Sequence, residues 1–179
     1  MINIGLGCPN FTFAVYIANK PPMFEYHELN KVQPLINDEI QTIGQACGNG
    51  WRKVFNVYAK LLFALDNTLF PYSIQAQRWQ EYRDHFLLQS NTNTALLFTA
   101  PHLAANSNVI HIICGKSHVK NLLTTKKLSA QLLWLDNEFA IDKVKRVIVC
   151  PYFDYRQLSN IKIERLAILI NELKNSAII

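Results

Sequence analysis

The apolar run at residues 109–114 is the sequence feature that most constrains the fold of this chain. The run is rich in β-branched residues, which is typical of a strand covered on both faces in a parallel sheet flanked by helices. Gly115 lets the backbone leave this strand sharply, and apolar residues at helical spacing follow. The sequence therefore predicts a central strand and then a helix. Lys116, Ser117 and His118 would lie at the carboxyl end of the strand, where open α/β sheets bind ligands.

Four other stretches predict the remaining framework of an α/β fold. Residues 11–18 and 144–150 are mostly apolar, and proline follows each of them within three residues, so both predict strands. Residues 51–65 and 161–173 carry apolar side chains at three- and four-residue spacing, which predicts amphipathic helices. The alternation of strands and helices predicts a single α/β domain over residues 1–179. We expect a three-layer α/β/α sandwich around a short, mostly parallel sheet.

Three stretches give weaker predictions. Residues 73–88 mix polar and aromatic side chains and predict a second helix. Residues 95–105 fit an edge strand or a broken helix, and the alanines with Pro101 favour the helix. Residues 128–135 end in an apolar group that predicts another strand.

The composition indicates a globular protein. Half of the residues are hydrophobic and 17% are charged, which excludes a disordered chain. The formal charge of +5 permits a polyanionic partner without requiring one. We expect no signal peptide, because no basic region precedes an apolar core at the amino terminus. No stretch approaches the roughly 18 consecutive apolar residues of a membrane span, so we expect a cytoplasmic protein.

The four cysteines do not predict a metal site. Cys8, Cys47, Cys114 and Cys150 are scattered and form no C-x-x-C pair. We expect them to be reduced thiols, and we expect neither a metal nor a cofactor.

Three segments would meet at the carboxyl edge of a parallel sheet, and they are the candidate binding site. They are residues 19–22, 115–118 and 150–156, each at the end of a predicted strand. This edge would be cationic and aromatic, because Lys20, Lys116 and Arg156 could hold phosphates while Tyr152, Phe153 or Tyr155 stacked on a flat ring. The alternative is that the tyrosines cap the core and the charged side chains only solvate the tips of the loops.

Other catalytic patterns are weaker. A phosphate-binding loop would need glycine at position 110, where isoleucine stands. His111 lies inside an apolar strand and fits a hydrogen-bonded core histidine better than a base. Cys150 fits a small buried residue better than a nucleophile. Asp154 could activate water as a base, or it could bond its own backbone in a turn, and the turn is the favoured reading.

The order of these features resembles that of the uracil-DNA glycosylase superfamily. The first strand of that family ends in a Gly-x-x-Pro loop, and residues 13–22 are similar and end in Ala-Asn-Lys-Pro-Pro. Residues 48–52 and the helix after them resemble the glycine-bearing segment and long helix of the family. Residues 112–119 are similar to its middle strand with a Gly-x-x-Ala motif. Residues 147–173 resemble its last strand, its His-Pro loop and its terminal helix.

The resemblance implies a nucleic-acid site and hydrolysis of the bond between base and sugar. In the family an acidic or amide residue of the first loop positions water, a role that would fall to Asn19. A histidine of the last loop stabilises the departing base, but Cys150 stands there in this chain. Arg156 or Tyr152 would have to replace it, and losing one such donor typically costs about a hundredfold in rate. Residues 49–60 also resemble an uncharacterised bacterial family, which implies no function.

Three functional hypotheses follow. The first is binding of a nucleobase, a nucleotide or DNA at the strand ends, with Asn19 or Asp154 positioning water if the protein is catalytic. The second is a non-catalytic protein-interaction module, which an exposed patch of Trp79, Tyr82 and Phe86 would support. The third is an enzyme acting on a phosphorylated metabolite, which would lack the steep salt dependence of DNA binding.

Overall fold

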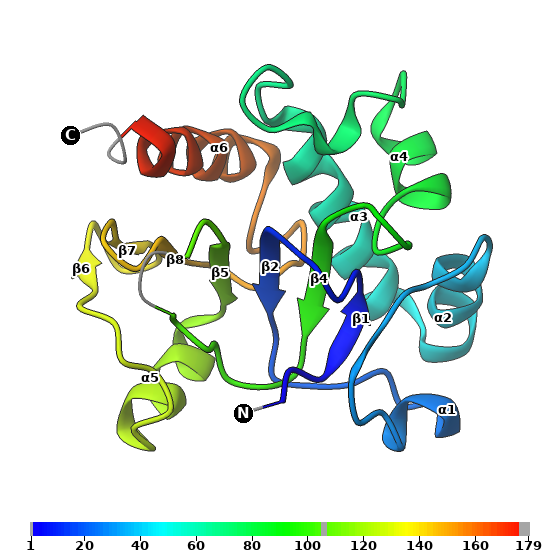
Figure 1. The fold of residues 1–179 in the computed structure, drawn as a ribbon, viewed down its shortest axis with the longest axis horizontal. Helices are drawn as coiled ribbons and strands as arrows, with labels where there is room; N and C mark the ends of the chain where they lie inside the picture. Colours follow the sequence, from blue (N-terminus) through cyan, green and yellow to red (C-terminus); the bar gives the residue numbers. More distant parts are fainter. Residues whose placement is uncertain (1, 105–106, 176–179) are drawn as a thin grey trace.

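The computed structural model describes residues 2–104 and 107–175, which form a mixed α/β fold (Figure 1). Strands and helices alternate along much of this chain, as the sequence predicts. The elements are, in order, β1 (Gly5–Gly7), β2 (Phe13–Tyr16), α1 (Phe24–His27), β3 (Val32–Gln33), α2 (Glu39–Cys47), α3 (Asn49–Ala64), the 3-10 turn η1 (Pro71–Ser73), α4 (Trp79–His85), β4 (Thr94–Leu97), β5 (Ile110–Cys114), α5 (Lys116–Thr124), β6 (Leu133–Trp134), β7 (Ala140–Asp142), β8 (Val147–Cys150) and α6 (Asn160–Asn175).

The described residues form one eight-stranded sheet in the order β3-β1-β4-β2-β5-β8-β7-β6. The four central strands β4, β2, β5 and β8 are parallel to one another, whereas β1 is antiparallel to β4, and β6, β7 and β8 pair antiparallel. In Figure 1 the arrowheads of β2, β4 and β5 point the same way and that of β1 points the opposite way. The predicted mostly parallel sheet is confirmed. The prediction of a short sheet is wrong, because small edge strands extend the parallel centre on both sides.

The prediction of a helix at residues 95–105 is also wrong. Thr94–Leu97 forms β4, which pairs with β1 and β2 inside the sheet, and all four of its residues are buried. Strand formation here depends on the two neighbouring strands rather than on the local preference of alanine and leucine, and tertiary pairing overrides such preferences.

The two faces of the sheet bury different side chains. On one face Val15 of β2 and Ile112 of β5 belong to a core with the apolar stripes of α3 and α6, for example Phe55 and Ile170. On the other face the alternate residues of the same strands pack against α5; these residues are Tyr16 and Ile113, with Val119 and Leu122 of the helix. Successive residues of a strand point to opposite faces, so the sheet is covered by helices on both sides.

The predicted aromatic surface patch is not present. The predicted helix at residues 73–88 is replaced by η1 and the shorter α4. Tyr82 is fully buried and stacks on Phe86, which with Trp79 is only partly exposed and packs against the core. These three side chains therefore pack mainly against the core and do not form the exposed apolar patch that the interaction-module hypothesis needs.

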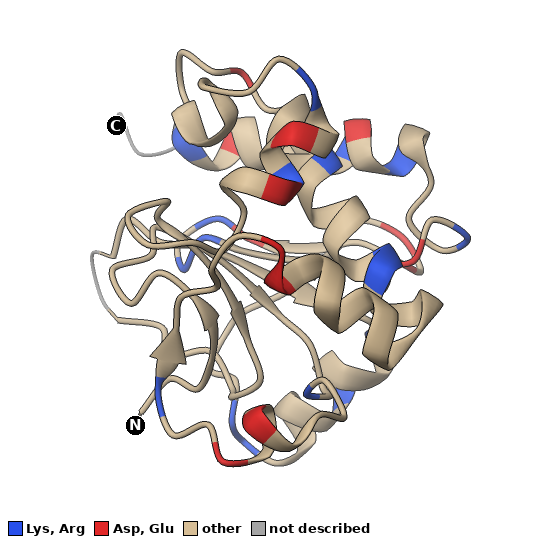
Figure 2. Ribbon diagram, turned by 90° about the vertical axis from the view of Figure 1, so that its right-hand side faces the viewer, with Lys and Arg blue, Asp and Glu red and all other residues tan. Residues whose placement is uncertain are grey.

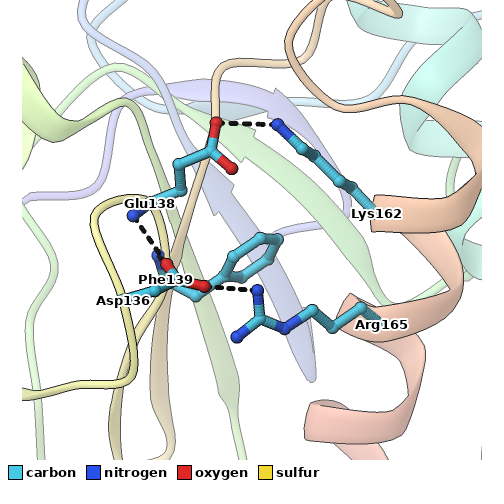
Figure 3. A network of polar contacts seen from close by, with 5 residues as sticks. All are labelled: Asp136, Glu138, Phe139, Lys162 and Arg165. Atoms are coloured by element: carbon cyan, nitrogen blue, oxygen red, sulfur yellow. Dashed lines mark hydrogen bonds and ion pairs between the residues drawn. The ribbon is translucent and has the colours of Figure 1, made fainter.

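The β6–β7 hairpin is held against α6 by charged side chains (Figure 3). Lys162 donates a hydrogen bond of 2.7 Å to Glu138, and Arg165 donates one to Asp136. The Arg165 guanidinium also lies 4.4 Å from the centroid of the Phe139 ring. Together these contacts attach an edge of the sheet to the last described helix.

Basic and acidic residues are interspersed along the ribbon in the view of Figure 2, so the positive net charge does not belong to one element. None of the helices in the described part of the chain is long and apolar enough to cross a membrane.

Candidate functional site

The carboxyl ends of β2, β5 and β8 lie side by side, as the sequence predicts. These strands are adjacent and parallel, with Tyr16 opposite Ile113 and Cys114 opposite Cys150. The Gly115 N–H donates a hydrogen bond of 2.9 Å to the Cys150 carbonyl, so the second and third loops start in contact. The four parallel strands lie in the order β4-β2-β5-β8. The chain passes from β2 to β4 on one side and later from β5 to β8 on the other, so the direction of the crossovers changes between β2 and β5. A crevice at such a switch point is where open sheets bind ligands.

The loop after β5 turns directly into α5. Gly115 has a φ of +92° and nothing within 4 Å of the place where a Cβ would stand, so glycine is needed for the turn and not for space. Lys116 and Ser117 are exposed at the start of the helix, and the Lys116 ammonium lies 5.4 Å from the centroid of the Trp134 ring. This part of the edge presents a cation and a hydroxyl to solvent.

His118, the third residue of α5, is half-buried. Burial lowers its pKa, and the carbonyl of Cys114 acts in the opposite direction. Its Nδ1 is buried and has no hydrogen-bond partner among the described residues. The imidazole is therefore neutral at pH 7 and faces protein more than solvent.

The loop after β8 forms a compact charged turn. Asp154 Oδ1 accepts a hydrogen bond of 2.9 Å from the Arg156 N–H, and Oδ2 lies 2.9 Å from Lys53 Nζ of α3. Burial on its own would raise the pKa of Asp154, but the Arg156 N–H and the Lys53 ammonium together lower it. Asp154 is thus an ionised turn residue whose two carboxylate oxygens each already have a partner, which leaves neither oxygen unoccupied for a water.

Two cations approach the Tyr155 ring. Lys53 Nζ is 4.8 Å and the Arg156 guanidinium carbon is 6.0 Å from the ring centroid. Tyr155 is 55% exposed, whereas Tyr152 is half-buried against the core and Phe153 is fully buried. Tyr155 is therefore the residue able to stack on a ligand, and the prediction that Phe153 could do so is wrong.

The loop after β2 contributes Asn19 and Lys20. Asn19 is exposed, and Lys20 donates a hydrogen bond of 3.4 Å from Nζ to the His27 carbonyl. Both residues follow β2 at the same edge as the other two loops.

Comparison with known proteins identifies the family to which the chain belongs. A family model described as a family of unknown function (DUF6942) matches residues 4–171. The chain belongs to this family. No curated protein and no solved structure matches the chain. Membership of an uncharacterised family is thus confirmed, and the resemblance to uracil-DNA glycosylases remains a prediction.

In this DUF6942 chain, His111 and Cys150 have the structural roles that the sequence favours, a hydrogen-bonded core histidine and a small buried residue. His111 and Tyr16 share a hydrogen bond of 2.8 Å between Nδ1 and the hydroxyl. Cys114 and Cys150 are buried free thiols on adjacent strands, and burial raises the pKa of Cys114. A neutral buried thiol is a poor nucleophile. The described residues contain no group of three or more His, Cys, Asp or Glu side chains placed to hold a metal ion.

Lys53 is the site residue that sequence reasoning missed. It lies on α3, 101 positions from Asp154, where its spacing indicates only the polar side of a helix. None of the nine predicted residues lines any of the four best-defined cavities of the described residues. The exposed side chains of Asn19, Lys116 and Tyr155 give the candidate site its surface at the strand ends. A cavity of about 600 Å³ lies elsewhere, beside Thr12 and Asn93 at the opposite ends of the strands.

Proposed function

We propose that this protein binds nucleic acid along the carboxyl edge of its parallel strands. The observation that carries the proposal is the exposed ring of Tyr155 with Lys53 and Arg156 beside it. Proteins that bind single strands combine aromatic rings for the bases with cations for the phosphates. Lys20, Lys116, Ser117 and Arg156 would contact the backbone, and a base would stack on Tyr155.

The charges at this edge favour a phosphate ligand. Asp154 is the one predicted site residue with negative charge, and Lys53 neutralises it. Within the described chain, Lys20, Lys116 and Arg156 form no ion pair with a carboxylate. Uncompensated cations attract a polyanion at a distance and release its counterions on binding.

The open shape of the site favours a polymer over a metabolite. Small-molecule ligands are usually enclosed in cavities of about 300–1,000 Å³. The side chains of the proposed edge are mostly exposed among the described residues, and a strand can lie across several exposed loops and gain contacts at each. This reasoning ranks nucleic acid above a phosphorylated metabolite.

Hydrolysis of a base–sugar bond is the reaction that the resemblance to uracil-DNA glycosylases implies. Asn19 is exposed and could position a water, but Asp154 has both oxygens engaged. His118 and Tyr152 are only partly accessible. These contacts support binding more than they support catalysis, and the proposal is a cytoplasmic binding protein in which cleavage is an outcome to be tested.

The test is fluorescence anisotropy with labelled single- and double-stranded DNA, each with and without uracil. With about three phosphate contacts on a single strand, log affinity should fall with log salt at a slope of about −2, so binding should weaken about 20-fold between roughly 50 and 200 mM salt. Alkaline heating of the same samples would reveal abasic sites. Breaks at uracil would add a glycosylase activity to binding, and intact strands would leave binding alone.

Variants of Tyr155 and Arg156 identify the site. Tyr155→Ala should weaken single-strand binding about 5- to 150-fold, because stacking on one aromatic ring is worth about 1–3 kcal/mol, and Tyr155→Phe should retain it. Arg156→Gln should reduce the salt slope by about 0.7, and the matched charge removal Arg78→Gln, at the residue just before α4, should not. Absence of binding at low salt, or unchanged binding by Tyr155→Ala, would refute the proposal.

A further inference from the structure

The cavity at the amino ends of the parallel strands has the properties of a second binding site. Its volume is about 600 Å³, and it lies at the opposite end of the sheet from the proposed nucleic-acid surface. We call it the amino-edge cavity. Its lining includes Phe70, Ile74, Phe86, Asn93, Arg146 and Lys174. Cavities of this size typically enclose a small organic molecule.

One part of the lining is apolar. Phe70 and Ile74, on either side of η1, join Phe86 and Ile110. Ile74 is 62% exposed, so the apolar side is open to solvent at that residue. Such side chains favour the body of an apolar or aromatic ligand.

The other part of the lining is polar and comes from the residues that precede the strands. Asn93 directly precedes β4, and Asn108 lies just before β5. Thr12, just before β2, shares a hydrogen bond of 2.8 Å with the Tyr72 hydroxyl. The cavity therefore combines an apolar side with amides and hydroxyls, which is the usual division of a small-molecule site.

Arg146 gives the cavity its charge. This residue directly precedes β8, and its carbonyl accepts a hydrogen bond of 2.9 Å from the His111 N–H. Its Nη1 donates a bond of 3.2 Å to the Asn108 side chain, whereas its Nε is buried and has no partner among the described residues. Burial hides Nε from a ligand, so the guanidinium would meet a ligand oxyanion through the part of the group that lines the cavity.

The backbone supports the same conclusion. Arg146, a residue of the cavity lining, has a φ of +55°. Left-handed conformations are uncommon for residues other than glycine, asparagine and aspartate, and they cluster at functional sites. Arg146 is therefore held in an unfavourable conformation at the position where its side chain reaches the cavity.

No described residue of the lining neutralises the positive charge. Of the described residues that line the cavity, Arg146 and Lys174 are basic and none is acidic. Lys174 donates a hydrogen bond to the Leu69 carbonyl, and its Nζ lies 4.8 Å from the centroid of the Phe70 ring. The amino-edge cavity thus has two cations next to an apolar wall.

We propose that the amino-edge cavity binds a small organic anion, with its carboxylate or phosphate on Arg146 and its apolar body against Phe70, Ile74 and Phe86. A guanidinium suits both oxyanions, since it can donate two parallel hydrogen bonds. The site is independent of the proposed nucleic-acid surface, so either can fail without the other.

Amide NMR titration of the whole chain with three probes tests this proposal. The probes are phenylacetate, phenyl phosphate and the neutral benzyl alcohol. We expect at least one anion to bind with a Kd below about 1 mM and to shift the amide signals of Thr12, Asn93 and Arg146, while benzyl alcohol binds at least about tenfold more weakly. The stronger of the two anions identifies the group that Arg146 holds.

Two variants and a control decide the role of Arg146. Arg146→Gln should weaken anion binding about tenfold or more, whereas Lys145→Gln, which removes the same charge one position away, should leave it unchanged. Ile74→Glu places a negative charge at an exposed position of the lining and should also weaken binding, even if Arg146→Gln fails to fold. The proposal is overturned if neither anion shifts these signals at about 10 mM, if benzyl alcohol binds equally well, or if Ile74→Glu leaves anion binding unchanged.

Discussion

Acid should destabilise this protein through a single buried histidine. His111 is 3% exposed and shares its Nδ1 hydrogen bond with Tyr16, which is 1% exposed. Burial lowers the pKa of His111 from 6.5 to about 4, and the nearby charge of His102 acts in the same direction. The unfolded chain therefore binds a proton more readily than the folded chain, and stability must fall as the pH drops from 6.5 toward 4.

The magnitude follows from the two pKa values of His111. At pH 7.5 the group is neutral in both states and contributes almost nothing to the pH dependence. At pH 5.0 the unfolded histidine is protonated and the folded one is still neutral, since its pKa is about 4. The free energy of unfolding should thus be lower at about pH 5.0 than at about pH 7.5 by roughly 2 kcal/mol, with each pKa unit worth about 1.4 kcal/mol.

Urea unfolding followed by circular dichroism at the two pH values measures this loss. The matched variant is the double substitution Tyr16→Phe with His111→Leu, which removes both polar partners and should stay within about 1–2 kcal/mol of the wild type at pH 7.5. It should lose about 2 kcal/mol less than the wild type at pH 5.0, because the other histidines titrate equally in both proteins. Tyr16→Phe alone should cost about 1–3 kcal/mol, because it leaves His111 without its partner. An equal loss of stability in the wild type and the double variant would refute the assignment to His111.

Three further predictions concern stability. Gly7→Ala should cost about 2–4 kcal/mol in thermal or urea unfolding, because the new Cβ would lie 2.3 Å from a backbone carbonyl of β4 at a φ of +121°. Gly115→Ala should cost only about 1–2 kcal/mol, because its φ is positive but the space is open, and equal costs at the two positions would contradict this. Asp136→Asn should cost about 1 kcal/mol of unfolding free energy at pH 7 and almost nothing near pH 2. Backbone N–H groups and an arginine lower the pKa of this half-exposed carboxylate to about 2, so its contribution to stability is lost as the pH falls from about 4 through that value. A difference from the wild type that stays constant with pH would refute this prediction. Tyr58→Phe should cost about 1 kcal/mol in the same assay, because the fully buried hydroxyl donates a hydrogen bond of 2.9 Å to the Ala95 carbonyl, and a neutral variant would show that this bond adds nothing.

The elements that sequence reasoning found are those with a strong local pattern. Residues 110–114 form a fully buried strand because the run is apolar at every position except His111, and α3 forms because its apolar residues recur on one face. The sequence of Thr94–Leu97 has no pattern that distinguishes a strand from a helix. This segment forms a strand because it pairs with β1 and β2. The three-residue β7 is likewise too short to carry a periodic signal.

The candidate site was predictable at the level of the loops and not of their side chains. The parallel order of β2, β5 and β8 brings Lys20, Lys116 and Arg156 to one edge, as the apolar runs and their terminal residues predict. The same loops contain Tyr152 and Tyr155, which look alike in sequence, yet only the second is largely exposed. Burial depends on what packs above each ring, and that information is not local.

The sequence by itself determined the class of this fold, the position of its main strands and helices and the cationic, aromatic character of three strand-end loops. These properties follow from the spacing of apolar residues and from turn-forming glycine and proline, which act over a few residues. Only the tertiary structure decided the eight-strand order, the pairing of Lys53 with Asp154 and the cavity around Arg146. Each of these joins residues far apart in the chain, and their proximity results from the packing of the whole core.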